Sequence, residues 1–343
     1  YATGALLFYP AAQFEAFGYF LLSLYILTFG LAFLETTASP FIMSMGDSKN
    51  ATRRLNLAQA FNPFGSLLGM FIASNFILSK LKSDERDISG ELLFNSLSVA
   101  EKAVIRTYDL SIISTPYIIL GFVVIAMLFM IAVTKMPEKN NQQAVSSVSS
   151  TFKRLLGNPN YIEGVIAQMF YVGAQIMCWT FIIQYANKLG IPKAVAQNYN
   201  IVAMVIFLTS RFLSTFLMKS ISSKKLLTLF AIGGIISILG VIFIQTIEGL
   251  YFLIATSAFM SLMFPTIYGI ALKGLGSDTS MGAAGLVMAI VGGALMPPLQ
   301  GWIIDFGSVG NFNSVNVSFV LPLICFCIVA VYGYRSYKIH DYS

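Results

Sequence analysis

Blocks of about twenty apolar residues, separated by short polar joints, limit the fold of this chain more than any other feature of its sequence. A helix of that length crosses a hydrocarbon core about 30 Å thick. Charged residues make up only 10% of the 343 residues, whereas an ordinary soluble domain has about 25%. Because backbone groups in lipid must be satisfied within the segment, the sequence predicts an all-α polytopic membrane protein.

The apolar blocks predict nine complete spans and one partial span at the N-terminus. The partial span covers 1–12, and the complete spans cover 16–43, 55–79, 111–134, 161–187, 195–218, 226–247, 250–272, 281–304 and 315–334. Tyr1 lies inside an apolar stretch with no charged region before it, which indicates a truncated N-terminus.

The distribution of basic residues predicts the orientation of these spans. Thirteen Lys and Arg residues fall in one set of alternate joints and seven in the other. Positive residues accumulate in short cytoplasmic loops, so we expect the first set and the C-terminus to be cytoplasmic. The outer loop 80–110 has mixed charge, and we interpret it as a solvated connector. Its capping-box pattern, Ser98 to Glu101, leaves a short surface helix as the alternative.

A polar segment rich in Ser, Gln and Asn divides the predicted spans into two groups. This division predicts an N-terminal helical half at 1–134, a central cytoplasmic loop at 135–158 and a C-terminal helical half at 159–343.

Several classes of function lack the residues that they need. The three cysteines, Cys178, Cys325 and Cys327, lie in apolar blocks and indicate neither a disulfide framework nor a metal site. The single histidine, His340, lies in the C-terminal tail, so a buried proton relay must use carboxylates. Despite a net charge of +6, the basic residues form no stripe for nucleic acid. With no phosphate-binding motif or nucleophilic triad, the sequence predicts neither an enzyme nor a cofactor.

Glu35 is the one acidic residue that lies deep inside a predicted span. It is about nine residues from the cytoplasmic joint, or ~13 Å along a helix. A charge at that depth costs at least about 2.5 kcal/mol and is usually retained for function. Burial disfavours the charged form of a carboxyl group, so Glu35 is our candidate proton-coupling residue. The alternative is a static salt bridge with a buried basic partner, although no neighbouring span shows an obvious deep basic residue.

Two groups of polar residues are candidates for contacts with a polyhydroxyl ligand. Gln59 and Asn62 lie ~7 and ~12 Å into the next span, on adjacent parts of one face, and can reach the depth of Glu35. Hydrogen bonding between helices is the alternative for these amides. Gln168, Tyr171, Gln175 and Trp179 follow helical spacing and form one stripe. A place in an interfacial aromatic belt is the alternative for Trp179.

Arg211 lies about eight residues from Lys219 at the end of its span. Its side chain could extend to the cytoplasmic surface, and it could instead belong to a cytoplasmic gate.

Seven segments of the sequence resemble a known family, the fucose:proton symporter family of the major facilitator superfamily. They are LETTASPF (34–41), RLNLAQAFNPFG (54–65), TPYIILG (115–121), AQMFYVGAQIMCW (167–179), SRF (210–212), FPTIYGIALKGLG (264–276) and LVMAIVGGALMPPLQG (286–301). They occur in family order over nearly the whole chain.

The resemblance implies twelve spans in two six-helix halves, with the first two spans missing and Tyr1 within the third. It implies that Glu35 works beside an Asp on the first span, which this chain does not contain. Gln59 and Asn62 match polar positions of the fifth span, the stripe from Gln168 to Trp179 matches the seventh, and Asn198 matches an Asn at the start of the eighth. We therefore expect a monomer in the bacterial inner membrane that couples uptake of L-fucose or a related hexose to protons by alternating access.

Two departures leave the sugar open. Phe264 stands where fucose permeases often have Tyr, and PPLQG (297–301) occurs in relatives with a broader hexose preference. Transport of glucose, galactose or another hexose is thus the main alternative. Two other classes of protein are less consistent with the sequence. A membrane enzyme would need clustered catalytic groups, and a transport-like sensor would need a signalling domain; the sequence shows no such cluster and no such domain.

Overall fold

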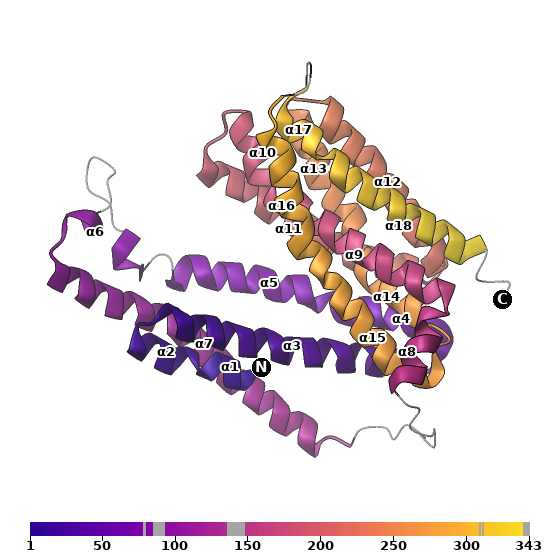
Figure 1. Cartoon of the computed structure of the whole chain (residues 1–343), viewed down its shortest axis with the longest axis horizontal. Coiled ribbons are helices and arrows are strands. Elements are labelled where there is room, and N and C mark those ends of the chain that lie inside the picture. Colours follow the sequence, from indigo (N-terminus) through magenta and orange to yellow (C-terminus); the bar gives the residue numbers. More distant parts are fainter. Residues whose placement is uncertain (78–79, 85–92, 136–147, 309, 311, 339–343) are drawn as a thin grey trace. The chain divides into compact units, whose positions relative to one another are not determined.

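A computed structural model describes residues 1–77, 80–84, 93–135, 148–308, 310 and 312–338, which are largely helical (Figure 1). The first segments are α1 (Ala2–Leu6), α2 (Phe8–Phe14), α3 (Phe17–Ser44), η1 (Ser48–Asn50), α4 (Ala51–Gln59), α5 (Phe61–Ile72), η2 (Ala73–Ile77), η4 (Lys82–Asp84), α6 (Leu93–Ser96) and α7 (Val99–Val133). The later segments are α8 (Val148–Leu156), α9 (Pro159–Thr180), α10 (Ile182–Lys188), α11 (Lys193–Leu217), α12 (Ser223–Phe243), α13 (Ile247–Met260), α14 (Met263–Leu272), η5 (Gly276–Asp278), α15 (Thr279–Met288), η6 (Ala289–Val291), α16 (Gly292–Asp305), α17 (Ser314–Ser318) and α18 (Val320–Lys338).

Eight helical segments among the described residues are long and apolar enough to cross a membrane. The predicted spans 16–43, 195–218 and 226–247 agree closely with α3, α11 and α12. The predicted span 55–79 is not among the eight; its described part is divided into α4, α5 and η2, with a break at Ala60.

The interpretation of 80–110 as a solvated connector is wrong for 99–110, where the alternative, a helix that starts at Ser98, is found as the beginning of the long helix α7. Ser98 Oγ accepts a hydrogen bond from the backbone N–H of Glu101, and the Glu101 carboxylate accepts one from the backbone N–H of Ser98 at 2.9 Å. This capping box starts the helix, and no Gly or Pro interrupts it before Pro116. Residues 85–92 of the predicted loop lie outside the described residues.

The described chain divides into two compact units, which we describe separately. Residues 1–35 and 68–143 form one, and 36–67 and 144–343 form the other. In the first unit, α1 and α2 pack on α7, and the rings of Phe8 and Tyr117 stack at 3.8 Å between centroids. The predicted helical halves, 1–134 and 159–343, concern topology and remain a prediction.

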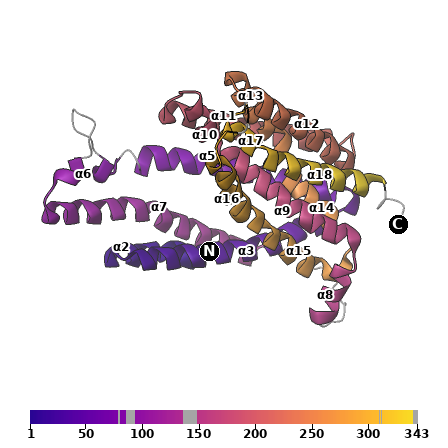
Figure 2. The ribbon, with the colours of Figure 1, turned by 45° about the horizontal axis from the view of Figure 1, so that its top comes forward.

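The second unit has its main core around α9. This helix packs against α14, α16 and α18, and α18 in turn packs along α12, an arrangement that both views of the ribbon show (Figures 1 and 2). Gly164 and Gly173 allow the close approach, because a Cβ at either position would lie 2.5 Å from a side-chain atom of the neighbouring helix. Near one end of the α9–α18 pair, Glu163 and Arg335 form an ion pair at 2.8 Å.

Gly249 gives the sharpest prediction for the packing of this unit. A Cβ at this position would lie 1.9 Å from the Ile244 carbonyl oxygen and 2.1 Å from the Tyr185 hydroxyl. Overpacking costs about 1–3 kcal/mol, so Gly249→Ala should lower the melting temperature of the purified protein by several degrees. Gly301→Ala is the matched control, since its Cβ would meet nothing within 4 Å. Equal melting temperatures for the two variants would contradict the packing described here.

Candidate functional site

An interruption between α13 and α14 gathers polar groups within one membrane-spanning segment. α13 ends at Met260 and α14 begins at Met263. The Tyr171 hydroxyl of α9 donates to the Met260 carbonyl at 2.9 Å, and the Ser210 hydroxyl of α11 donates to the Ala258 carbonyl at 2.8 Å. The Met260 carbonyl lies at the end of α13, so the Tyr171 hydroxyl supplies a donor there, whereas the Ala258 carbonyl accepts from Ser210 in addition to the Ser261 backbone N–H at 3.3 Å.

Arg211 of α11 donates to two backbone carbonyls. Its Nε binds the carbonyl oxygen of Ser261, and its Nη1 binds that of Gln59, at the end of α4, at 3.0 Å. Residues four positions later would normally donate to these oxygens, but they are Pro265 and Pro63, which have no N–H. The guanidinium therefore replaces two backbone donors that proline removes from two different helices.

The charge of Arg211 is stabilised by an aromatic ring and by helix ends, and it has no carboxylate partner among the described residues. The side chain is only 4% exposed, and the guanidinium carbon lies 4.6 Å from the centre of the Phe207 ring. Helix C-terminal ends carry partial negative charge, which favours a cation at this position. The burial shows that Arg211 does not extend to the surface, which was one of its two interpretations.

The predicted stripe on α9 is confirmed as one face of a continuous helix, and its members differ in their partners. Trp179 Nε1 donates to Ser257 Oγ of α13 at 3.2 Å, and its ring meets Phe207 edge-on at 4.9 Å. Gln168 is fully buried, and neither its amide oxygen nor its amide nitrogen has a hydrogen-bond partner among the described residues. Gln175 is half-buried and makes no hydrogen bond within the described part of the chain.

The amides predicted from the fifth span and the start of the eighth lie in different surroundings. Gln59 Nε2 donates weakly to Ser39 Oγ at 3.4 Å, and the Gln59 backbone carbonyl is the acceptor for Arg211. Asn62 in α5 and Asn198 in α11 have exposed side chains, which form no hydrogen bond with the described residues. The structure thus brings Gln59 and Arg211 together and leaves the side chains of Asn62 and Asn198 open to a ligand.

Glu35 lies in the long helix α3, nine residues before its last residue, Ser44. Its side chain is half-buried. At 1.5 Å per residue this distance is ~13 Å, the depth that the sequence predicts. Glu35 belongs to the first compact unit, whereas the other candidate residues belong to the second.

Sequence reasoning missed two buried amides. Asn56 Nδ2 donates to Thr266 Oγ1 at 3.1 Å and so joins α4 to α14, while Gln300 Nε2 donates to Ser318 Oγ at 3.0 Å. Both amides are fully buried, and the amide oxygen of each has no partner among the described residues. Asn56 precedes Gln59 by three residues on the same helical face, a spacing that could have identified it.

Comparison with known proteins gives a consistent relationship. Residues 1–297 match the family described as Major Facilitator Superfamily. The L-fucose-proton symporter of Haemophilus influenzae is 62% identical over 340 residues, covering 99% of this chain and 79% of that protein. A putative glucose/galactose transporter of Helicobacter pylori is 30% identical, covering 100% of this chain and 80% of that protein. The crystal structure of the transporter FucP in the outward conformation matches with a TM-score of 0.89 and 32% identity, covering 98% of this chain and 80% of that one.

Proposed function

The chain belongs to the Major Facilitator Superfamily, and from that premise we propose that it carries L-fucose or a closely related hexose across the membrane together with protons. We place it in a bacterial inner membrane with its C-terminus in the cytoplasm, acting as a monomer without a cofactor and driven by the proton gradient. The asymmetry of basic residues and the bacterial sources of its relatives support this placement.

The observation that carries the proposal is the pair of amides on α9 that have no hydrogen-bond partner among the described residues. Gln168 and Gln175 lie on one face of a membrane-spanning helix, next to the interruption between α13 and α14. An unsatisfied buried amide costs about 1–3 kcal/mol. A sugar hydroxyl both donates and accepts, so a bound hexose would supply the missing partners. Interrupted helices near the midplane are typical positions of substrate sites in secondary transporters.

Alternating access requires that proton and sugar each prefer one conformation. We propose that protonated Glu35 favours loading of sugar from the outside, and that release of the proton inside favours the return. Arg211 is the proposed gate, because it joins α4 from the first half of the sequence to α11 and the α13–α14 interruption from the second. These contacts would hold the cytoplasmic end closed and must break before sugar leaves on that side.

The direct test is uptake by proteoliposomes that contain the complete purified protein under an imposed inward proton gradient. Labelled L-fucose should accumulate above its external concentration, and an uncoupler should abolish this accumulation. Parallel uptake of glucose and galactose decides between L-fucose and the hexose alternative that the Helicobacter relative suggests. Absence of accumulation for all three sugars would refute the proposed function.

Gln168 offers a second test, because a structural role and a binding role predict different results. Gln168→Leu removes a buried amide that has no partner, so the melting temperature should rise or stay constant. If Gln168 reaches the sugar during the cycle, the same change should weaken sugar affinity about tenfold, the equivalent of one hydrogen bond. Gln175→Ala should weaken affinity by a similar factor. Unchanged sugar binding in both variants would exclude the α9 face from the substrate site.

A further inference from the structure

The helices α4 and α14 pack closely through polar side chains within the second compact unit. Asn56 Nδ2 donates to Thr266 Oγ1 at 3.1 Å and to the Thr52 carbonyl at 2.9 Å. One turn away, a Cβ at Gly269 would lie 2.8 Å from Thr52 Oγ1 and 2.9 Å from its Cγ2. The two helices therefore run antiparallel in contact, and we call Thr52, Asn56, Thr266 and Gly269 the α4–α14 interface.

The face of α14 towards α4 differs from its face towards α9. Towards α9 the contact is apolar, since a Cβ at Gly164 would lie 2.5 Å from the Ala271 Cβ. Towards α4, Asn56 and Thr266 are both fully buried, and the amide oxygen of Asn56 has no hydrogen-bond partner among the described residues. An unpaired buried acceptor lowers stability, whereas apolar side chains of similar shape would not. A contact that never opens gains nothing from this arrangement, so it indicates that the α4–α14 interface meets water or a ligand in another conformation.

The position of the interface shows which movement would open it. α4 begins two residues after Lys49, and α14 ends directly before Lys273, both in joints that the distribution of basic residues places in the cytoplasm. α4 precedes the central segment 135–158 and α14 follows it. Alternating access moves these two parts of a transporter against each other, so the cytoplasmic ends of α4 and α14 must separate when the inner side opens.

On the basis of the function proposed above, we propose that the α4–α14 interface is the closed cytoplasmic exit for the sugar, and that Asn56 and Thr266 hydrogen-bond a sugar hydroxyl when it opens. An amide and a hydroxyl offer both donors and acceptors, as a sugar hydroxyl does. Gly269 sets the distance between the helices, because its missing side chain leaves the space that Thr52 occupies.

The experiment measures how readily the interface opens, through the rate at which a water-soluble maleimide labels Leu55→Cys. The complete protein is used, with its native cysteines replaced by alanine. Leu55 is fully buried next to Asn56, so label reaches this position only when α4 and α14 separate. Gly269→Ala should raise the labelling rate about tenfold, because its Cβ overlaps Thr52. Adding Thr52→Ala removes two of the overlapping atoms and should return the rate towards that of the parent.

Apolar substitutions should have the opposite effect. Asn56→Leu and Thr266→Val remove the polar groups that water or sugar would contact, so each should lower the labelling rate about tenfold. The melting temperature should rise or stay constant. The maximal rate of uptake should fall, while the affinity for sugar offered from outside should not change. A weaker outside affinity with an unchanged labelling rate would overturn the assignment of these residues to the exit.

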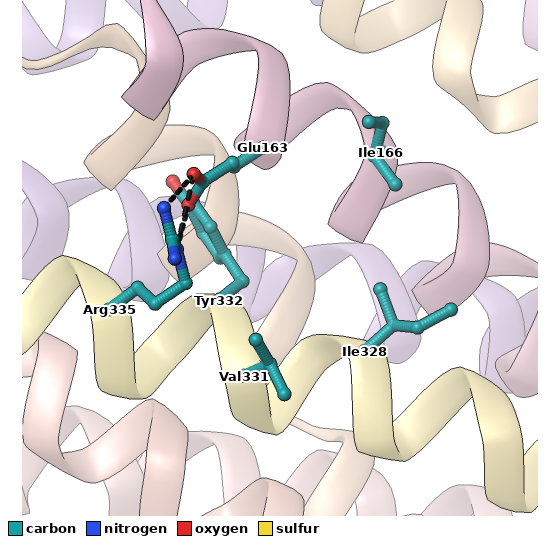
Figure 3. A pocket seen from close by; sticks show the side chains of 6 residues that line it. All are labelled: Glu163, Ile166, Ile328, Val331, Tyr332 and Arg335. Atoms are coloured by element: carbon teal, nitrogen blue, oxygen red, sulfur yellow. Dashed lines mark hydrogen bonds and ion pairs between the residues drawn. The ribbon is translucent and has the colours of Figure 1, made fainter.

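The ion pair of Glu163 and Arg335 provides the matched control. Figure 3 shows the two side chains facing each other between α9 and α18, and Arg335, like Gly269, lies three residues before the end of its helix. Both helices follow the central segment, so opening of the inner side does not separate them. Arg335→Gln should therefore leave the labelling rate at position 55 unchanged.

The labelling rate does not depend on sugar, which separates this proposal from the proposed function. Equal labelling in the parent, Gly269→Ala and Asn56→Leu would overturn the proposal, whatever the protein transports. If labelling changes as expected while the wild type accumulates none of the three sugars, the interface opens as described and the proposed function is what fails.

Discussion

In the Glu35→Gln variant, uptake of sugar against its concentration gradient should fall to the level of vesicles without protein. Glutamine keeps the size and the hydrogen-bonding groups of a protonated glutamate, but it cannot release a proton. The variant should therefore imitate the protonated state permanently, and sugar binding should persist. Exchange of external for internal labelled sugar should continue, because exchange requires no net movement of protons.

The measurement is a pair of assays on the same proteoliposomes: proton-driven accumulation and sugar exchange without a gradient. Glu248→Gln is the matched control, because Glu248 is an exposed glutamate at the start of α13 whose carboxylate accepts a hydrogen bond from the Thr246 hydroxyl. It should retain both activities. If Glu35→Gln accumulates sugar as well as wild type does, Glu35 is not the coupling group and a static role becomes the better interpretation.

The membrane spans were predictable because lipid imposes both length and apolarity on a helix. α3, α11 and α12 agree with their predicted spans to within a few residues. The sequence predicted the start of α7 only as an alternative, a short surface helix, because the mixed charge of 99–110 is also typical of a solvated connector. Its capping box was visible in the sequence, and the absence of Gly and Pro between Ser98 and Pro116 was the signal that favoured a longer helix.

The sequence could predict which residues of the candidate site share a helical face. It could not predict which residues of other helices they contact. Helical spacing identified the stripe from Gln168 to Trp179, since all its members must share one face. Spacing could not show that Tyr171 and Trp179 bind α13, because those contacts depend on residues 89 and 78 positions later in the chain. Pro63 and Pro265 show in the sequence which carbonyls lose their donors, but only the packing shows that Arg211 serves both.

Replacing Arg211 by Gln should produce the second large effect. The change removes two charge-assisted hydrogen bonds, each worth about 1.5–3 kcal/mol, and leaves two buried carbonyls without donors. We expect a clear fall in melting temperature and a transport rate at least tenfold lower. Arg211→Lys should recover only part of both, because one ammonium group is less suited than a planar guanidinium to two acceptors from different helices. The part that Arg211→Lys recovers would then show how much of the effect depends on one of the two contacts, with the Ser261 carbonyl or with the Gln59 carbonyl.

The Pro63→Ala substitution provides the control that distinguishes a gate from a general loss of packing. Pro63→Ala restores an N–H that can donate to the Gln59 carbonyl, so this oxygen no longer needs Arg211. In the Arg211→Gln background, Pro63→Ala should therefore recover part of the lost stability, and the two effects should not add. If the recovered protein is stable but still slow in transport, Arg211 acts on the cycle through its link between α4 and α11. If stability and transport recover together, its role is structural, and the gate must be sought elsewhere.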